Sequence, residues 1–267
     1  MILRRKRFRL PPISTLLAYP IYAFLIMPTV IVVPMSFSSG NELVFPPRSL
    51  DLGLYRKLLD PSSGWLDASL RSFKIASLTA IIALCLGVPA AYGLARARFP
   101  GKSALGFSML SPIFAPTIVL ALGLYLYFIK LGIAGSVLGL VFAHTLLVTP
   151  FVIVTVGSAI LQLDEGIEHA GAVLGAGPIR IFFQIVVPGL RSSLLAGGLF
   201  AFLMSFDEVV VAWFVGTNSD PTLPVKMYSS IQWEVSPVLA AISTILVLLT
   251  VMVCLVAAMT QPPQVES

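Results

Sequence analysis

The chain has 267 residues, of which 57% are hydrophobic and only 11% are charged, and its mean hydropathy is +0.96. Soluble domains carry roughly 45–50% apolar and about 25% charged residues, so this composition excludes a soluble protein and indicates an integral membrane protein. The formal net charge of +5 does not indicate a nucleic-acid partner, because the basic residues gather beside apolar segments, where they orient a membrane protein.

The N-terminal segment predicts the orientation of the chain. The first apolar segment, residues 13–37, is preceded by five basic residues, Arg4, Arg5, Lys6, Arg7 and Arg9. Basic residues beside a membrane span stay on the cytoplasmic side, so we expect a cytoplasmic N-terminus. The segment is longer than the apolar part of a signal peptide and does not end in a small-x-small cleavage pattern. We therefore interpret it as a retained first span.

Five further apolar segments follow along the chain, at residues 69–95, 104–129, 136–161, 190–215 and 237–259. Each is long enough for the roughly 20 residues of a transmembrane helix. Together the six segments predict an all-α membrane protein with six transmembrane helices and a cytoplasmic C-terminus, organised as a single transmembrane domain over residues 1–267. The connection at residues 162–189 is then a cytoplasmic loop.

Shorter patterns add detail to this picture. Apolar residues recur at helical spacing over residues 52–59, which predicts a short interfacial helix after the first span. Pro112 and Pro116 predict a kink in the third span. Gly101-Lys102-Ser103 lacks the earlier glycine of a phosphate loop, and the sequence shows no metal-binding cluster or nucleophile–base pair. We therefore expect no catalytic residue, no metal and no cofactor in this chain.

The 162–189 loop carries the signals of two short helices. Asp164 precedes an apolar stripe at helical spacing and therefore predicts a capped amphipathic helix. Gly175 predicts a turn, and Gly177-Pro178 predicts the start of a second helix. A helix of this kind can lie in a groove of a partner protein. The alternative is a helical hairpin that rests on the bilayer surface.

The same loop resembles the cytoplasmic loop of permease subunits from ABC-type, binding-protein-dependent importers. That loop has the pattern Glu-Glu-Ala-Ala-x-x-Leu-Gly-Ala followed by Phe-x-x-Ile-x-x-Pro. The residues that match it here are Glu168, Ala170, Leu174, Gly175, Ala176, Phe182, Ile185 and Pro188. His169 and Gly171 depart from the pattern, at the second Glu and the second Ala. We expect that Glu168 carries the charged contact in place of the missing glutamate, or that the partner's groove differs.

The resemblance implies a type I ABC importer permease fold and a set of partners. It implies docking to an ATPase dimer, which binds ATP and Mg, through Glu168, His169, Ala170, Gly171, Leu174, Gly175, Ala176, Arg180, Phe182 and Pro188. It also implies a second permease subunit that forms a heterodimer with this chain, an extracytoplasmic solute-binding protein and a place in the bacterial inner membrane. ATP hydrolysis is then expected in a separate chain.

Other segments extend the resemblance over nearly the whole chain. Residues 65–76 and 89–102 are similar to the second span of these permeases and its junction with the third. Residues 205–215 and 223–229 most resemble the second permease subunit of the spermidine/putrescine branch. That branch implies a small cationic solute such as a polyamine. Related systems for opines and other cationic solutes share the pattern, so the solute itself stays open.

Asp207 and Glu208 are adjacent carboxylates within the fifth apolar segment. Each costs about 2.5–3.5 kcal/mol near the bilayer centre, so both are expected to face protein or water. Neighbouring helical residues point about 100° apart, so only one can line a narrow pathway well. With Phe206 and Trp213, that carboxylate could attract a cationic solute through charge and cation–π contacts. The alternative is a structural hydrogen bond between helices.

Aromatic residues on the expected outer face are candidates for contact with a binding protein. These are Tyr228 and Trp233, together with Glu234, since aromatic side chains are enriched in interface cores. An interfacial aromatic belt explains Tyr228 and Trp233 equally well. Two other functions stay open at this point. One is a secondary transporter driven by an ion gradient through Asp207 and Glu208, and the other is a structural membrane subunit without a pathway.

Overall fold

A computed structural model describes residues 13–39, 44–217, 219–233 and 236–260, and this part of the chain is helical without any strand. By its contacts the chain divides into two compact units, Met1–Gly64 with Ser230–Ser267 and Trp65–Ser229. The single domain over residues 1–267 stays a prediction. The all-helical fold that the sequence predicts is confirmed for the described residues.

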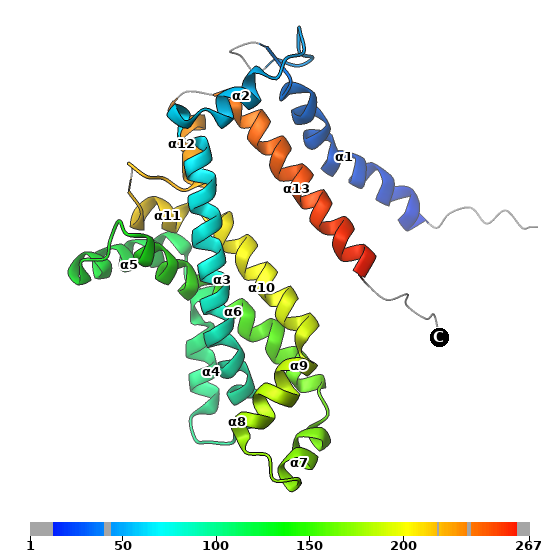
Figure 1. Cartoon of the computed structure of the whole chain (residues 1–267), viewed down its shortest axis with the longest axis vertical. Helices are drawn as coiled ribbons and strands as arrows, with labels where there is room; N and C mark the ends of the chain where they lie inside the picture. The colour runs from blue at the N-terminus through cyan, green and yellow to red at the C-terminus, as the bar shows by residue number, and fades with distance from the viewer. Residues whose placement is uncertain (1–12, 40–43, 218, 234–235, 261–267) are drawn as a thin grey trace, which may run out of the picture. The chain divides into compact units, whose positions relative to one another are not determined.

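The first unit pairs the two terminal helices. α1 (Ile13–Met35) packs along α13 (Val238–Thr260), and the short helix α2 (Gly53–Leu59) contacts α13 (Figure 1). α2 confirms the helix expected over residues 52–59. Its Tyr55 hydroxyl lies 2.7 Å from the Ser36 hydroxyl at the end of α1, and its ring lies 5.4 Å from that of Phe37. These contacts fix α2 against the chain that follows α1.

Three long helices form the centre of the second unit: α3 (Trp65–Arg96), α6 (Val137–Gln162) and α10 (Arg191–Phe206). Each packs against the other two (Figure 1). Small residues on α3, Ala83, Gly87 and Ala91, recur every four positions and face this contact. Small side chains let helix backbones approach closely, which is how helices associate in membranes.

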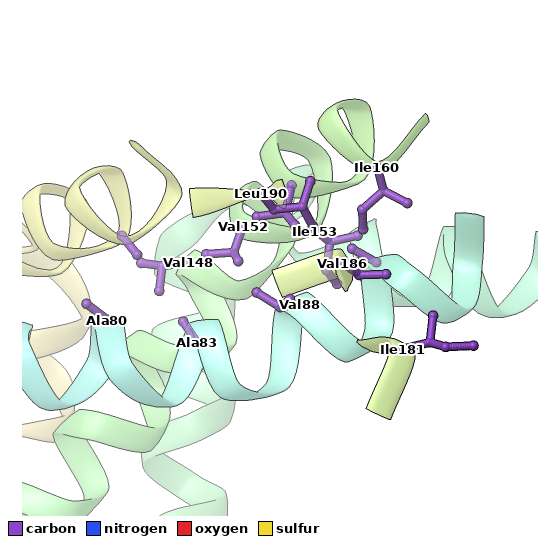
Figure 2. Close-up of a cluster of buried hydrophobic side chains, with 13 residues drawn as sticks. Ala80, Ala83, Val88, Val148, Val152, Ile153, Ile160, Ile181, Val186 and Leu190 are labelled. Atoms are coloured by element: carbon purple, nitrogen blue, oxygen red, sulfur yellow. The ribbon is translucent and has the colours of Figure 1, made fainter. Parts of the chain in front are cut away.

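One apolar core joins these helices to the segment that leads into α10. Figure 2 shows its side chains gathered between the ribbons, among them Val88 of α3 and Val152 of α6. The core continues into the 162–189 loop through Ile181 and Val186, and then to Leu190 directly after the loop, and all three residues are buried. The loop therefore shares a core with the long helices and is part of the fold.

The third predicted span is broken where the prolines stand. α4 (Lys102–Leu110) and the 3-10 turn Ser111–Ile113 are bent by 99° from α5 (Thr117–Leu131). Pro112 lies in the first turn of the 3-10 segment and Pro116 precedes α5. Proline lacks the N–H that continues a helix, so the chain changes direction at this point. The kink predicted for this span is confirmed in a sharper form.

The fifth predicted span is also interrupted. Directly before it, the helical segment Pro178–Gly189 is bent by 77° from α10. The interruption within the span comes later, at a place without proline. α10 ends at Phe206, and a short helix α11 (Val210–Val215) follows after Asp207, Glu208 and Val209. The two carboxylates therefore lie in a gap between helices. The sequence analysis expected a continuous helix over residues 190–215.

Several described helices are candidates for membrane spans. Three described helices are long and apolar enough to cross a membrane, Leu17–Met35, Trp65–Arg96 and Val137–Gln162, and the number rises to five if each bent pair forms one span. A shorter apolar stretch covers Val238–Met252. The count of six spans and the cytoplasmic termini stay predictions.

The first turns of α3 contact α12 (Leu223–Trp233). Most of α12 belongs to the second unit, which ends at Ser229. Arg71 donates to the carboxylate of Asp220 at 2.8 Å and to its backbone oxygen at 3.0 Å. Ser72 accepts a hydrogen bond from the amide of Leu223 at 2.7 Å, and the Lys226 ammonium lies 4.8 Å from the ring centre of Trp65. Burial lowers the pKa of Lys226, and the Asp67 carboxylate opposes this shift.

Two glycines of α3 give a matched test of the close contact with α6. A Cβ at Gly87 would lie 2.8 Å from a methyl of Val152, whereas a Cβ at Gly93 would meet nothing within 4 Å. We expect Gly87→Ala to be less stable than Gly93→Ala by about 1–3 kcal/mol, the usual cost of overpacking. Thermal unfolding in detergent measures the difference. Equal midpoints for the two variants would show that α3 and α6 are not packed this closely.

Candidate functional site

The first helix of the 162–189 loop begins as its sequence predicts. α7 covers Glu165–Val173, and the Asp164 carboxylate accepts a hydrogen bond at 2.8 Å from the amide of Gly166. Asp164 thereby satisfies one of the free N–H groups at the helix start. Glu165 and Glu168 lie in the first turn, where the helix dipole favours negative charge. The predicted capped helix is confirmed.

The end of α7 is a glycine turn. Gly175 has φ +87°, which favours glycine. The amide of Ala176 donates to the carbonyl of Gly171, and the amide of Gly175 donates to that of Ala172, both at 3.0 Å. This pair of bonds is the Schellman motif that closes many helices. The predicted turn at Gly175 is confirmed.

The chain then restarts as a helix at Pro178. Gly177 is extended, and α8 (Pro178–Ile181) runs into a π-helical turn, Phe182–Val186, and then into α9 (Val187–Gly189). Pro188 lies in the first turn of α9. The start at Pro178 is the one that the sequence predicts, while nothing in the sequence analysis indicated the π-helical turn. Such turns are rare and are frequent at functional sites.

The most polar contact of the loop is made with the end of α3. Arg96 donates to Oε1 of Glu168 from Nε at 3.0 Å and from Nη2 at 2.9 Å. It also donates to the Glu165 carboxylate and to the carbonyl of Leu163, each at 2.8 Å. The Tyr92 hydroxyl donates to Oε2 of Glu168 at 2.7 Å. We call these five residues the Arg96 cluster.

The central pair of the Arg96 cluster is shielded from solvent. The Arg96 side chain is 13% exposed and that of Glu168 is 11% exposed. The Tyr92 ring adds an edge contact to Phe182 of the π-helical turn, with ring centres 5.2 Å apart. The outer partner, Glu165, is exposed. Arg96 and Tyr92 of α3 therefore contact α7, and Tyr92 also contacts the π-helical turn.

Sequence reasoning did not find this cluster. It named neither Arg96 nor Tyr92 as a site residue. Glu168 was expected to make a charged contact with a partner, and in the structure both of its oxygens accept hydrogen bonds from α3. Its docking role stays a prediction. A basic residue at the end of one span and acidic residues at the start of the loop were the available signals.

Most of the other loop residues named from the sequence are exposed. His169 is exposed, and its Nδ1 lies 2.7 Å from the backbone oxygen of Glu165. Gly171 is packed closely, because a Cβ there would lie 2.8 Å from a methyl of Ile185. Phe182 is half-buried. The exposed members of the set are Ala170, Leu174, Gly175, Arg180 and Pro188, and Ala176 is half-buried.

The loop presents apolar side chains at the end of α7. Val173 and Leu174 are each 87% exposed, and we call these two residues the tip. Ile179 and Phe183 of the following segments are also exposed. Large exposed apolar surfaces commonly mark interaction sites. Of these four residues, only Leu174 was named from the sequence as a docking residue.

The gap between α10 and α11 separates the roles of its two carboxylates. Glu208 accepts a hydrogen bond at 3.0 Å from the amide of Val211 and thus caps α11. Asp207 is exposed, and its carboxylate has no partner among the described residues. Phe206 stacks on Phe202, with ring centres 5.8 Å apart. This bond is local to one segment, so it is not the hydrogen bond between helices that was considered as the alternative, which stays a prediction.

The aromatic candidates lie partly together. Trp213 of α11 meets Tyr228 of α12 edge to face, with ring centres 5.6 Å apart, and both side chains are partly open to solvent. Trp233 is exposed at the end of α12. Glu234 lies outside the described residues. The structure thus joins one residue assigned to the pathway with one assigned to the binding-protein contact.

Comparisons with known proteins give matches over most of the chain. Residues 83–261 match the family model of the binding-protein-dependent transport system inner membrane component. The putrescine transport system permease protein PotI of Escherichia coli K12 is 32% identical over 84% of this chain and 82% of its own. The spermidine/putrescine transport system permease protein PotC of the same organism is 33% identical over 86% of each chain.

A solved structure has a similar fold. It is the crystal structure of a bacterial ABC transporter involved in the import of the acidic polysaccharide alginate. One of its chains aligns with a TM-score of 0.71 over 93% of this chain and 94% of its own, at 18% identity. At this identity the likeness concerns the fold alone.

Two glycines of the loop give a matched test of the turn. A Cβ added at Gly175 or at Gly177 would meet no atom within 4 Å, and of these two glycines only Gly175 has a positive φ. Gly175→Ala should cost roughly 1–2 kcal/mol of backbone strain, while Gly177→Ala should cost little. We expect amide hydrogen exchange in α7 to be about tenfold faster in Gly175→Ala. Equal exchange in the two variants would contradict the turn described.

Proposed function

Because the chain belongs to the family of binding-protein-dependent transport system inner membrane components, we propose that it forms half of a translocation pathway for a small cationic solute of the polyamine class. The chain is an inner-membrane permease subunit of an ABC importer. The polyamine class is supported by its similarity to permeases of putrescine and spermidine systems and by the chemistry of the gap in the fifth segment.

The observation that carries the solute class is the free carboxylate of Asp207. It stands at the break between α10 and α11, in an apolar segment, and has no partner among the described residues. An ionised carboxylate in such a segment is costly unless it serves a pathway or finds a counter-charge. A passing ammonium group supplies that counter-charge. Glu208 is then a capping residue, and Asp207 faces the pathway.

The aromatic residues near this break extend the proposal. Trp213 follows Asp207 on α11 and contacts Tyr228 edge to face. Aromatic faces attract ammonium groups by cation–π interaction, most strongly when water is excluded. Phe206, which precedes Asp207, is engaged with Phe202. We assign Asp207 and Trp213 to attraction of the solute and Phe206 to the wall of the pathway.

The proposed membrane arrangement has six spans. These are α1, α3, the bent pair of α4 and α5, α6, α10 with the residues after it, and α13. Pro178–Gly189 stays in the loop. The basic N-terminal cluster then places both termini and the 162–189 loop in the cytoplasm. This is the type I permease arrangement, with a second permease subunit in the same membrane.

The loop is the proposed contact with the ATPase dimer, which binds ATP and Mg and hydrolyses ATP in a separate chain. Because the Arg96 cluster turns Glu168 inward, the exposed contact rests on the apolar tip with His169 and Arg180 beside it. On the opposite side of the membrane, Tyr228, Trp233 and Glu234 are the proposed contacts for the solute-binding protein. This chain couples and conducts, and no cofactor is assigned to it.

The two carboxylates allow a sharp test of the pathway. In the importer assembled with its ATPase, sister permease and binding protein, Asp207→Asn should lower ATP-dependent uptake of putrescine or spermidine roughly tenfold, since it removes the attraction for an ammonium group. Glu208→Gln should keep most uptake, because its amide oxygen still accepts the bond from Val211. Radiolabelled uptake into proteoliposomes measures both.

Assembly must be intact in both variants, as judged by co-purification of the subunits. Unchanged uptake in Asp207→Asn would contradict the assignment of Asp207 to the pathway. Loss of uptake in Glu208→Gln alone would assign Glu208 to the pathway instead. Uptake by this chain without an ATPase would overturn the importer function and favour a secondary transporter.

The tip is tested by its exposure to a partner. Leu174→Asp places a charge in an apolar contact and should abolish co-purification of the ATPase while leaving the fold intact, because Leu174 is almost fully exposed. Leu50→Asp is the matched control, as Leu50 is similarly exposed in the connection after the first span. Retention of the ATPase by Leu174→Asp would place the docking contact elsewhere.

A further inference from the structure

We infer that the Arg96 cluster makes α3 and the 162–189 loop one rigid body, so that movement of the loop is transmitted to α3 as well as to α6 and α10. The inference rests on the proposed function, in which the ATPase moves the loop. It assigns to Arg96 and Tyr92 a positioning role in coupling.

The way α7 is attached to the protein leads to this inference. All nine residues of α7 are described, and Glu168 is the only one of them that is buried. An amphipathic helix usually docks through a buried apolar stripe. Ile167 and Val173, which belong to the predicted stripe, are exposed instead. Besides the close contact of Gly171 with Ile185, α7 is held by the bonds that its carboxylates make with α3.

The bonds are numerous and directional. The guanidinium of Arg96 donates to Glu165, Glu168 and the carbonyl of Leu163, so it holds both the start of α7 and the residue before its cap. Arginine presents its donors in a rigid planar fork, which fixes orientation as well as distance. Tyr92 takes the second oxygen of Glu168. A rotation of α7 would break several of these bonds at once.

The cluster is also shielded, which distinguishes it from a surface ion pair. Exposed pairs contribute little because water and salt screen them. With side chains 13% and 11% exposed, Arg96 and Glu168 would each become a buried unpaired charge if they separated. The pair therefore resists separation when the loop is pushed.

Chain connectivity shows what the cluster adds. The loop is covalently continuous with α6 and with α10, whereas Arg96 and Glu168 are 72 residues apart. The apolar core already joins the later part of the loop to α3. Arg96 and Tyr92 attach α7 to α3 as well. Because α3 packs on both α6 and α10, the three helices then follow the loop together.

The test measures the distance between α3 and α7 in the full importer. Cys85 and Cys254 are replaced by serine, and spin labels are placed at Leu86→Cys and Ile167→Cys, two exposed positions away from the tip. The distribution of distances between the two labels is recorded by pulsed electron paramagnetic resonance, first without nucleotide and then after trapping with ATP and vanadate. We expect one narrow distribution that is the same in both states. A shift on trapping in the parent importer would overturn the inference.

Variants separate positioning from mere stability. Arg96→Ala should broaden the distribution and shift it on trapping, with ATP hydrolysis maintained while putrescine uptake falls roughly tenfold. Arg96→Lys, which restores the charge without the fork, should recover part of the uptake. Arg98→Ala, an exposed neighbour, is the matched control and should behave as the parent. A distribution in Arg96→Ala as narrow as in the parent would overturn the inference.

Failure of the proposed function gives a different result. In that case the parent chain does not retain an ATPase and no vanadate-trapped complex forms, which removes the coupling role as well. The distance in the chain alone still decides the rigid attachment: Arg96→Ala must broaden it.

Discussion

Close approach of α3 and α6 is the contact on which the second unit depends. It is possible because Ala83, Gly87 and Ala91 leave the face of α3 almost flat, and Gly157 of α6 meets Ala91 in the same contact. In a membrane, lipid is as apolar as the side chains, so helices associate by packing and by hydrogen bonds. The contact also brings the end of α3 to the level at which the 162–189 loop leaves α6.

The Arg96 cluster and the apolar core divide the task of holding the loop. The core takes the segment after the glycine turn, through Ile181 and Val186. The cluster takes α7, which has no buried apolar residue. His169 is exposed and contacts only the backbone of its own helix, so Glu168 is the residue of α7 whose charge is directed toward the protein.

Local signals predicted local structure well. Asp164, Gly175 and Gly177-Pro178 act on the backbone within a few residues, and the cap, turn and helix start were found where the sequence placed them. The pairing of Arg96 with Glu168 was missed because it joins segments 72 residues apart, which no local pattern links. The break at Asp207 has no proline or glycine to announce it, so an apolar run looked continuous.

The Schellman turn at Gly175 separates what folds the loop from what a partner would touch. Val173 and Leu174 are almost fully exposed, so we expect substitutions at the tip to leave the helix, the turn and the Arg96 cluster intact. Specificity between two proteins is a difference in affinity and can change through a few side chains. Under the proposed docking role, a change at the tip alters the choice of partner, while the residues that fold the loop stay the same.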